Sequence, residues 1–89
     1  MVSLGAKGAL LVCDEGSFLA RPPKICAVST IGAGDSSIAG FLSVCGPSSL
    51  RLRSAVAFGT ASCLTPGTRP PRSEDVQAIL PQVILEKYE

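Results

Sequence analysis

The side chains best suited to chemistry lie in residues 29–35, STIGAGD, where a glycine-alanine-glycine run comes directly before a carboxylate. Gly32, Ala33 and Gly34 carry almost no side chain, so a ligand can approach the backbone closely there. Amide groups at a helix start lack intrahelical acceptors and lie at the positive end of the helix dipole, which favours a phosphate. Asp35 would then stand beside that phosphate as a base. The run equally suits a plain glycine turn whose aspartate caps a helix, and by itself it leaves both interpretations open.

Length and composition limit what the chain does unaided. Its 89 residues predict one small domain, residues 1–89. Hydrophobic residues make up 46% of the chain and charged residues 17%, and the mean hydropathy is +0.39. This is apolar for so small a chain. We therefore expect some of its faces to pack against further protein, either the rest of a longer polypeptide or another copy in a homo-oligomer. The alternative is a compact core under a surface with few charges.

Charge and cysteine usage exclude several function classes. The formal net charge is +1 with both signs interspersed, so we expect no nucleic acid and no anionic membrane as partner. The cysteines are widely spaced and the chain has no histidine, which argues against a zinc site. They lie inside apolar segments, as is typical of reduced thiols in a cytoplasmic protein. No apolar run approaches the length of a membrane span and no signal-peptide pattern occurs, so secretion and insertion are not expected.

The elements that must position Asp35 begin with a set of strands. Apolar runs at residues 1–4, 9–13 and 18–20 are separated by the turn sequences GAKG and DEGS, which predicts strands joined by tight turns. Pro22 and Pro23 end the third strand because proline cannot donate to a ladder. A further short strand is expected at residues 25–28, which delivers the chain to the glycine run.

Helical spacing replaces strand spacing from Asp35 onward. The first helix ends at Gly46 and Pro47, and its expected apolar side comprises Ile38, Ala39, Phe41, Leu42 and Cys45. Ser48 or Ser49 is expected to cap a second helix, whose apolar stripe comprises Leu52, Ala55, Val56, Gly59 and Cys63. A third helix starts at Ser73 with acidic residues in its first turn, and Pro81 ends or kinks it. Strands followed by helices predict an α/β or α+β arrangement in which helices cover a sheet.

Two blocks of this sequence resemble the C-terminal part of the PfkB, or ribokinase-like, carbohydrate kinases. They are SLGAKGA at residues 3–9 and STIGAGDS at residues 29–36, and they flank an apolar strand, a hairpin and two prolines in the family's order and spacing. The resemblance is strong over residues 2–42 and weaker over residues 52–62. The residues of these two blocks are most similar to those of the branch that holds 1-phosphofructokinase and tagatose-6-phosphate kinase. The fold that the resemblance implies is α/β, the C-terminal part of a ribokinase-like three-layer α/β/α fold, with a strand hairpin followed by helices.

The resemblance also implies a role for each block. Asp35 would be the general base that takes the proton from the sugar hydroxyl. Gly32, Ala33 and Gly34 would form the anion hole that neutralises the transferring phosphoryl group. Besides Gly34 and Asp35, the residues implied to line the ATP site are Ser3, Leu4, Gly5, Ala6, Lys7 and Gly8. Mg²⁺ would arrive bound to the nucleotide, and no metal ligand is expected from the chain.

Members of this family are much longer than 89 residues. The resemblance therefore implies a partner, the remaining N-terminal part of the kinase, which holds most of the sugar-phosphate site and the lid. The implied activity is ATP-dependent phosphorylation of a sugar phosphate, fructose 1-phosphate to fructose 1,6-bisphosphate, in the cytoplasm, by an enzyme of which this chain alone is an incomplete and inactive part. Residues 65–68, TPGT, stand where members of the family often have an asparagine near the nucleotide. The resemblance therefore does not extend to the adenine contacts of this segment. A non-catalytic kinase-like module that binds nucleotide or packs against a partner remains the alternative.

Overall fold

A computed structural model describes residues 1–3, 7–13, 16–24, 33–43, 46–64 and 71–88. In this part of the chain, four strands form one antiparallel sheet in the order β1-β2-β3-β4. Their bounds are β1 Val2–Ser3, β2 Ala9–Cys13, β3 Gly16–Arg21 and β4 Ile84–Tyr88. The strands predicted within residues 1–4, 9–13 and 18–20 are confirmed, since each overlaps one of the first three. The strand expected at residues 25–28 lies outside the described residues.

β4 is a strand that the sequence pattern did not predict. The third helix, α3 (Ser73–Ile79), gives way to a short 3₁₀ helix, η2 (Leu80–Gln82), that contains Pro81. The chain then becomes extended at Val83, which has φ −73° and ψ 124°. Five residues of β4 pair with β3, and this pairing crosses more than sixty positions of sequence. Proline ends the helix as expected, and the strand that follows depends on a distant partner.

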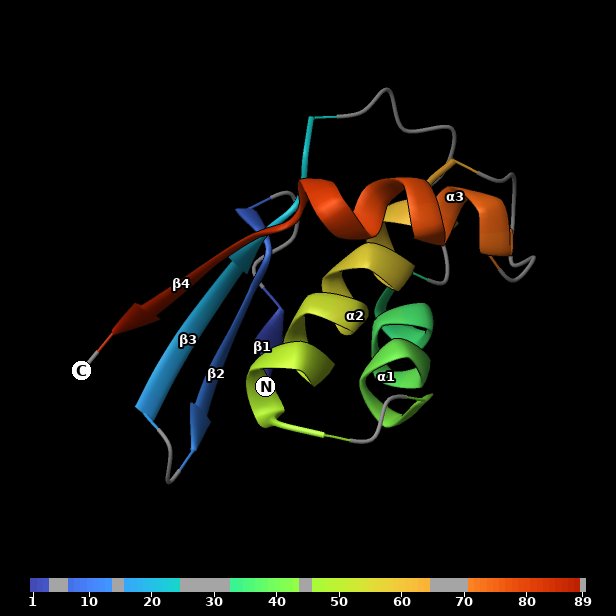
Figure 1. The fold of residues 1–89 in the computed structure, drawn as a ribbon. Coiled ribbons are helices and arrows are strands. Elements are labelled where there is room, and N and C mark those ends of the chain that lie inside the picture. Colours follow the sequence, from blue (N-terminus) through green and yellow to red (C-terminus); the bar gives the residue numbers. More distant parts are fainter. Residues whose placement is uncertain (4–6, 14–15, 25–32, 44–45, 65–70, 89) are drawn as a thin grey trace.

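The helices lie on one side of the sheet (Figure 1). α2 (Ser48–Ser62) contacts β2, β3 and β4 on one side, while α1 (Ala33–Ser43) and α3 pack against its other sides. α2 is therefore enclosed by protein nearly all round. Leu52, Ala57 and Ala61 have no exposed surface, and they join the strand residues Ala9, Leu11, Phe18 and Ala20 in the hydrophobic core.

The stripe predicted for the second helix is confirmed, but its cap is not. Leu52, Ala55, Val56 and Gly59 are buried, and Cys63 is half-buried at the helix end. Pro47 precedes the helix in an extended conformation, and its carbonyl oxygen accepts the amides of Leu50 at 3.0 Å and Arg51 at 3.2 Å. Ser48 and Ser49 are already helical, and no side chain caps this end. Pro47 is therefore the N-cap residue, and its own carbonyl starts the helix one residue earlier than a cap at Ser48 would.

The apolar side predicted for the first helix is wrong in its burial. Ile38 is 54% exposed and Leu42 is 74% exposed. Gly40 is buried instead, and Phe41 packs against the edge of the core. α1 reaches the rest of the described structure through α2, so only the side that carries Gly40 is covered.

Two further expectations concern cysteine and the membrane. The thiols of Cys13 and Cys63 are free and half-buried, in agreement with reduced cysteines; Cys26 and Cys45 lie outside the described residues. None of the described helices is both long enough and apolar enough to cross a bilayer.

Candidate functional site

The first turn of α1 forms the centre of the candidate site. The helix begins at Ala33, two residues before the start at Asp35 that the sequence pattern predicted. Ala33, Gly34 and Asp35 are thus the first three helical residues. The leading amides of an α-helix have no acceptor within the helix, so this turn presents donors at the positive end of the helix dipole. A carboxylate in the first turn is electrostatically favoured there, which suits Asp35.

Gly34 stands in open space. It is exposed, and a Cβ added to it would meet no heavy atom of the described chain within 4 Å. Its φ is not in the left-handed region, so the backbone does not require glycine either. Neither the packing of the described residues nor the backbone conformation requires glycine at this position. The absence of a side chain therefore leaves room for a ligand to approach the backbone amides.

Gly40 holds α1 in place. A Cβ built on it would lie 2.8 Å from Cβ and Cγ of Phe58 and 2.8 Å from the carbonyl oxygen of Ser54, both on α2. The two helix backbones approach so closely only because this side chain is absent. Sequence reasoning assigned Gly40 no role. The available signal was a glycine inside a helical pattern, which usually has a packing reason.

The second predicted block lies at the start of the hairpin. Ser3 ends β1 and Lys7 is exposed. Gly8 is buried with φ +108°, and a Cβ on it would collide with the carbonyl oxygen of Ala20. The hairpin thus accounts for Gly8 without a ligand, and its contact with nucleotide stays a prediction.

The described parts of the two blocks lie toward the same end of the fold. β1 runs away from the chain start, and α1 begins toward the end of the fold that β1 reaches (Figure 1). Four of the predicted site residues, Leu4, Gly5, Ala6 and Gly32, lie outside the described residues. Of the two blocks, the structure thus describes only the end of β1, residues 7–9 and the first turn of α1.

Arginines form a separate feature of the second half. Arg53 Nε donates to the carbonyl oxygen of Leu80 at 3.0 Å, which ties η2 to α2. Arg72 pairs at the surface with Glu74 at 3.3 Å. An open hollow of about 320 Å³ lies beside Arg53, lined by Leu50, Arg53, Ser54, Leu80 and Pro81. It contains none of the predicted site residues, and we assign it no role in the site.

Metal ligands are not gathered in the described part of the chain, where no group of three His, Cys, Asp or Glu residues could hold an ion. The first turn of α1 instead offers backbone donors, which suit an anion. The described part of the chain therefore offers a ligand the amides of a helix start rather than a cluster of metal ligands.

Comparison with known proteins gives matches over most of the chain. Residues 1–74 match the family model described as pfkB family carbohydrate kinase. The chain is 50% identical to 1-phosphofructokinase of Escherichia coli K12 over 42 residues, which are 47% of this chain and 14% of that protein. It is 38% identical to 1-phosphofructokinase of Bacillus subtilis over 88 residues, which are 93% of this chain and 28% of that protein. A crystal structure of phosphofructokinase-2 from E. coli in complex with potassium superposes with a TM-score of 0.84 at 37% identity, covering 91% of this chain and 27% of that one. This chain thus spans less than a third of the length of each of these relatives.

Proposed function

Because the chain belongs to the PfkB family of carbohydrate kinases, we propose that it is the nucleotide-binding and catalytic-base part of an ATP-dependent sugar-phosphate kinase. The acceptor is fructose 1-phosphate and the product is fructose 1,6-bisphosphate. The names of the relatives from E. coli and B. subtilis support this acceptor. The observation that carries the proposal is the open first turn of α1, where Gly34 stands in free space next to Asp35.

Asp35 takes the role of general base. The C6 hydroxyl oxygen of the acceptor attacks the γ-phosphorus of ATP, its proton passes to the Asp35 carboxylate, and the bond to the leaving ADP oxygen breaks. Asp35 immediately follows Gly34, so the base and the phosphate-binding amides belong to one rigid turn. Proton transfer to a positioned carboxylate typically contributes about a hundredfold to ten-thousandfold.

The backbone of Gly32, Ala33 and Gly34 provides the anion hole. Phosphoryl transfer depends mainly on positioning and on neutralising the charge of the equatorial oxygens. The helix amides of Ala33 and Gly34 do this without reorganisation, because the helix already aligns them. ATP lies along Ser3, Leu4, Gly5, Ala6, Lys7 and Gly8 in this proposal, and Mg²⁺ bound to its phosphates supplies further neutralisation.

The chain acts only together with the N-terminal part of such a kinase. It spans 14% to 28% of the two named relatives, so more than two thirds of the length of those enzymes has no counterpart in it. The 89-residue chain alone is therefore expected to have no measurable turnover.

A chimera tests the function. This chain replaces the 88 aligned residues of the B. subtilis 1-phosphofructokinase, and ADP release is measured with fructose 1-phosphate, fructose 6-phosphate and tagatose 6-phosphate. The proposal expects turnover that is fastest with fructose 1-phosphate and absent from the 89-residue chain. ATP binding without turnover on any sugar phosphate, in a folded chimera, would instead favour the non-catalytic nucleotide-binding module.

A further inference from the structure

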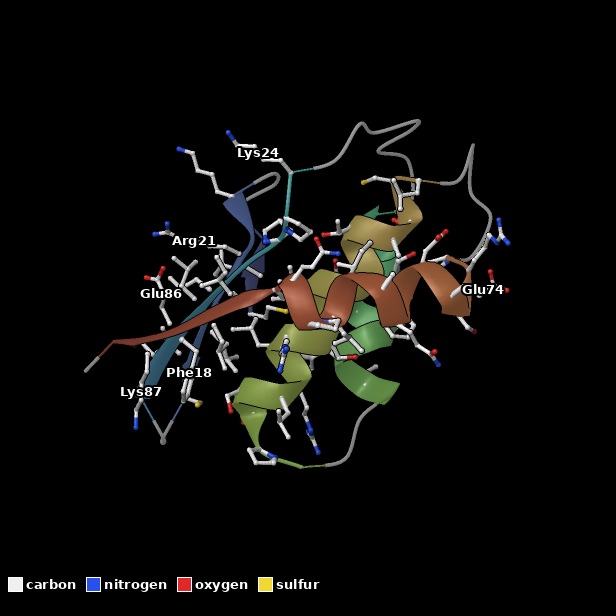
Figure 2. The ribbon with its side chains drawn as sticks, turned by 45° about the horizontal axis from the view of Figure 1, so that its top comes forward. Phe18, Arg21, Lys24, Glu74, Glu86 and Lys87 are labelled. Carbon is white, nitrogen blue, oxygen red and sulfur yellow. The ribbon has the colours of Figure 1, made fainter. Side chains whose placement is uncertain are left out.

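The position of α1 depends on one side of that helix. α1 lies along α2 on the side away from β3 and β4 in both views (Figures 1 and 2), and α2 is its main neighbour in the described part of the chain. Elsewhere on α1, Ile38 is 54% exposed and Leu42 is 74% exposed. A Cβ on Gly34 would meet no described heavy atom within 4 Å. The contact with α2 therefore determines where the first turn of α1 lies.

Ser54 and Phe58 of α2 form this contact with Gly40. They are four residues apart, so they lie one turn apart on the same side of α2. A Cβ built on Gly40 would lie 2.8 Å from the carbonyl oxygen of Ser54 and 2.8 Å from Cβ and Cγ of Phe58. The carbonyl belongs to the helix backbone, so Phe58 provides the side chain that meets the backbone of α1 at this point.

Phe58 has little freedom to give way. It is half-buried and packs against the hydrophobic core, and its neighbour Ala57 on α2 has no exposed surface. Protein interiors are close-packed, so a displaced side chain displaces its neighbours as well. The Phe58 side chain is thus a spacer of fixed thickness between the core and α1.

This spacer lies close to the candidate base along α1. Asp35 precedes Gly40 by five residues on the same helix, which is about 7.5 Å along the axis at a rise of about 1.5 Å per residue. A single helix moves nearly as one body, so a shift at Gly40 also moves Gly34 and Asp35. In an enzyme that works by positioning its reactants, a misplacement of about 1 Å can cost about a hundredfold in rate.

We infer that Phe58 is a positioning residue of the proposed kinase. Its Cβ and Cγ, backed by the core, fix α1 through Gly40 and so place Asp35 and the amide of Gly34 for phosphoryl transfer. Phe58 acts through α1 and does not touch the reacting atoms. The inference rests on the proposed function, since it takes Asp35 as the base.

Three substitutions in the chimera with the B. subtilis enzyme separate positioning from stability. Phe58→Ala removes Cγ and the ring, whereas Phe58→Leu keeps Cβ and Cγ, the two atoms of Phe58 nearest Gly40. Val56→Ala is the matched control, because it shortens another side chain of α2 that is only 6% exposed. Residues two apart in a helix lie on nearly opposite sides, so Val56 faces away from Gly40. Both alanine variants are expected to lower the Tm of the chimera.

Steady-state ADP release, measured well below the Tm of every variant, gives kcat and KM. Phe58→Ala is expected to lower kcat about tenfold or more and to leave the KM for ATP within about threefold, because ATP lies along residues 3–8 in the proposal. Phe58→Leu should keep kcat within about threefold of the unsubstituted chimera. Val56→Ala should also keep it within about threefold, in spite of its lower Tm.

Crystal structures of the Phe58→Ala and Val56→Ala chimeras provide an arm that does not depend on turnover. In Phe58→Ala, the first turn of α1 is expected to shift by about 0.5 Å or more relative to β2 and β3, because the helix relaxes toward the space that the ring has left. In Val56→Ala, the first turn is expected to stay in place.

The positioning inference is overturned if Phe58→Ala and Val56→Ala lower kcat equally, or if the first turn of α1 does not shift in Phe58→Ala. It is equally overturned if Phe58→Leu loses as much kcat as Phe58→Ala. An unsubstituted chimera that releases no ADP, with the expected shift in Phe58→Ala, removes the proposed function and keeps Phe58 as the residue that places α1. Turnover that Phe58→Ala leaves unchanged does the opposite.

Discussion

Gly40 on α1 and Phe58 on α2 touch so closely that no side chain fits between them. A Cβ on Gly40 would stand 2.8 Å from Cβ and Cγ of Phe58. Gly40 lies less than two turns after Asp35 on the same helix, so this contact sets where the first turn of α1 lies relative to the core. The position of the candidate base is thus decided by a glycine that has no part in the chemistry.

Gly40→Ala should destabilise the protein. The added methyl group forces α1 away from Phe58 and from the Ser54 carbonyl, and overpacking of this kind costs about 1–3 kcal/mol. This exceeds the gain of up to about 1 kcal/mol that alanine brings to a helix interior. Urea unfolding of the 89-residue chain measures the difference. Gly34→Ala is the matched control on the same helix, because its Cβ meets no described atom. Equal stability of the two variants would contradict the packing argument.

Gly34→Val should weaken ligand binding without destabilising the fold. The side chain occupies free space, so unfolding is expected to change by less than about 1 kcal/mol. ATP binding by the chimera, measured by calorimetry, should weaken by about tenfold or more, because the branched side chain stands over the first-turn amides. Unchanged ATP affinity would count against the anion hole.

Asp35→Asn tests the base in the chimera. The amide is nearly isosteric and cannot accept the proton, so kcat should fall by about a hundredfold to ten-thousandfold. The KM for ATP is expected to change only a few fold, because nucleotide binding rests on the backbone and on the first block. Steady-state ADP release gives both numbers. Turnover within about threefold of the unsubstituted chimera would remove Asp35 from this role.

Gly8→Ala should weaken the hairpin. Its φ of +108° is rarely adopted by residues with a side chain, and the Cβ would collide with the Ala20 carbonyl of β3. Gly46 has a similar φ of +139°, but its Cβ would meet only Leu50 Cδ1 at 3.9 Å. Gly46→Ala thus carries the conformational cost alone, about 1–2 kcal/mol. Gly8→Ala is expected to lower the stability measured by thermal unfolding more than Gly46→Ala does. An equal loss of stability would mean that the hairpin backbone shifts to make room for the methyl group.

Local patterns explain why part of the fold could be predicted from the sequence. The hairpin of β2 and β3 pairs neighbouring segments, and its turn residues and apolar runs are adjacent in the chain. The residues predicted as the apolar stripe of α2 are buried together with most of the rest of that helix. The location of Asp35 at a helix start follows from the change of period after the glycine run, although the helix begins at Ala33.

Long-range contacts explain what the sequence could not predict. β4 is a strand because β3 offers it an edge, and nothing in ILEKY demands that partner. Ile38 and Leu42 have the spacing of a buried side, yet they are exposed because α1 packs through Gly40 and Phe41. The spacing of apolar residues predicts that a segment is helical. It does not show which side of the helix another element packs against.

The proposed chemistry can be inferred from the sequence alone, because it rests on a carboxylate after a run of small residues at a helix start, in the order of blocks that marks the family. Tertiary packing is what leaves the space beside Gly34 open and fills the space beside Gly8 and Gly40 with neighbouring atoms. All three are the same residue type in the chain. What distinguishes them is whether another segment occupies the place of the missing side chain, and that depends on how distant parts of the chain pack.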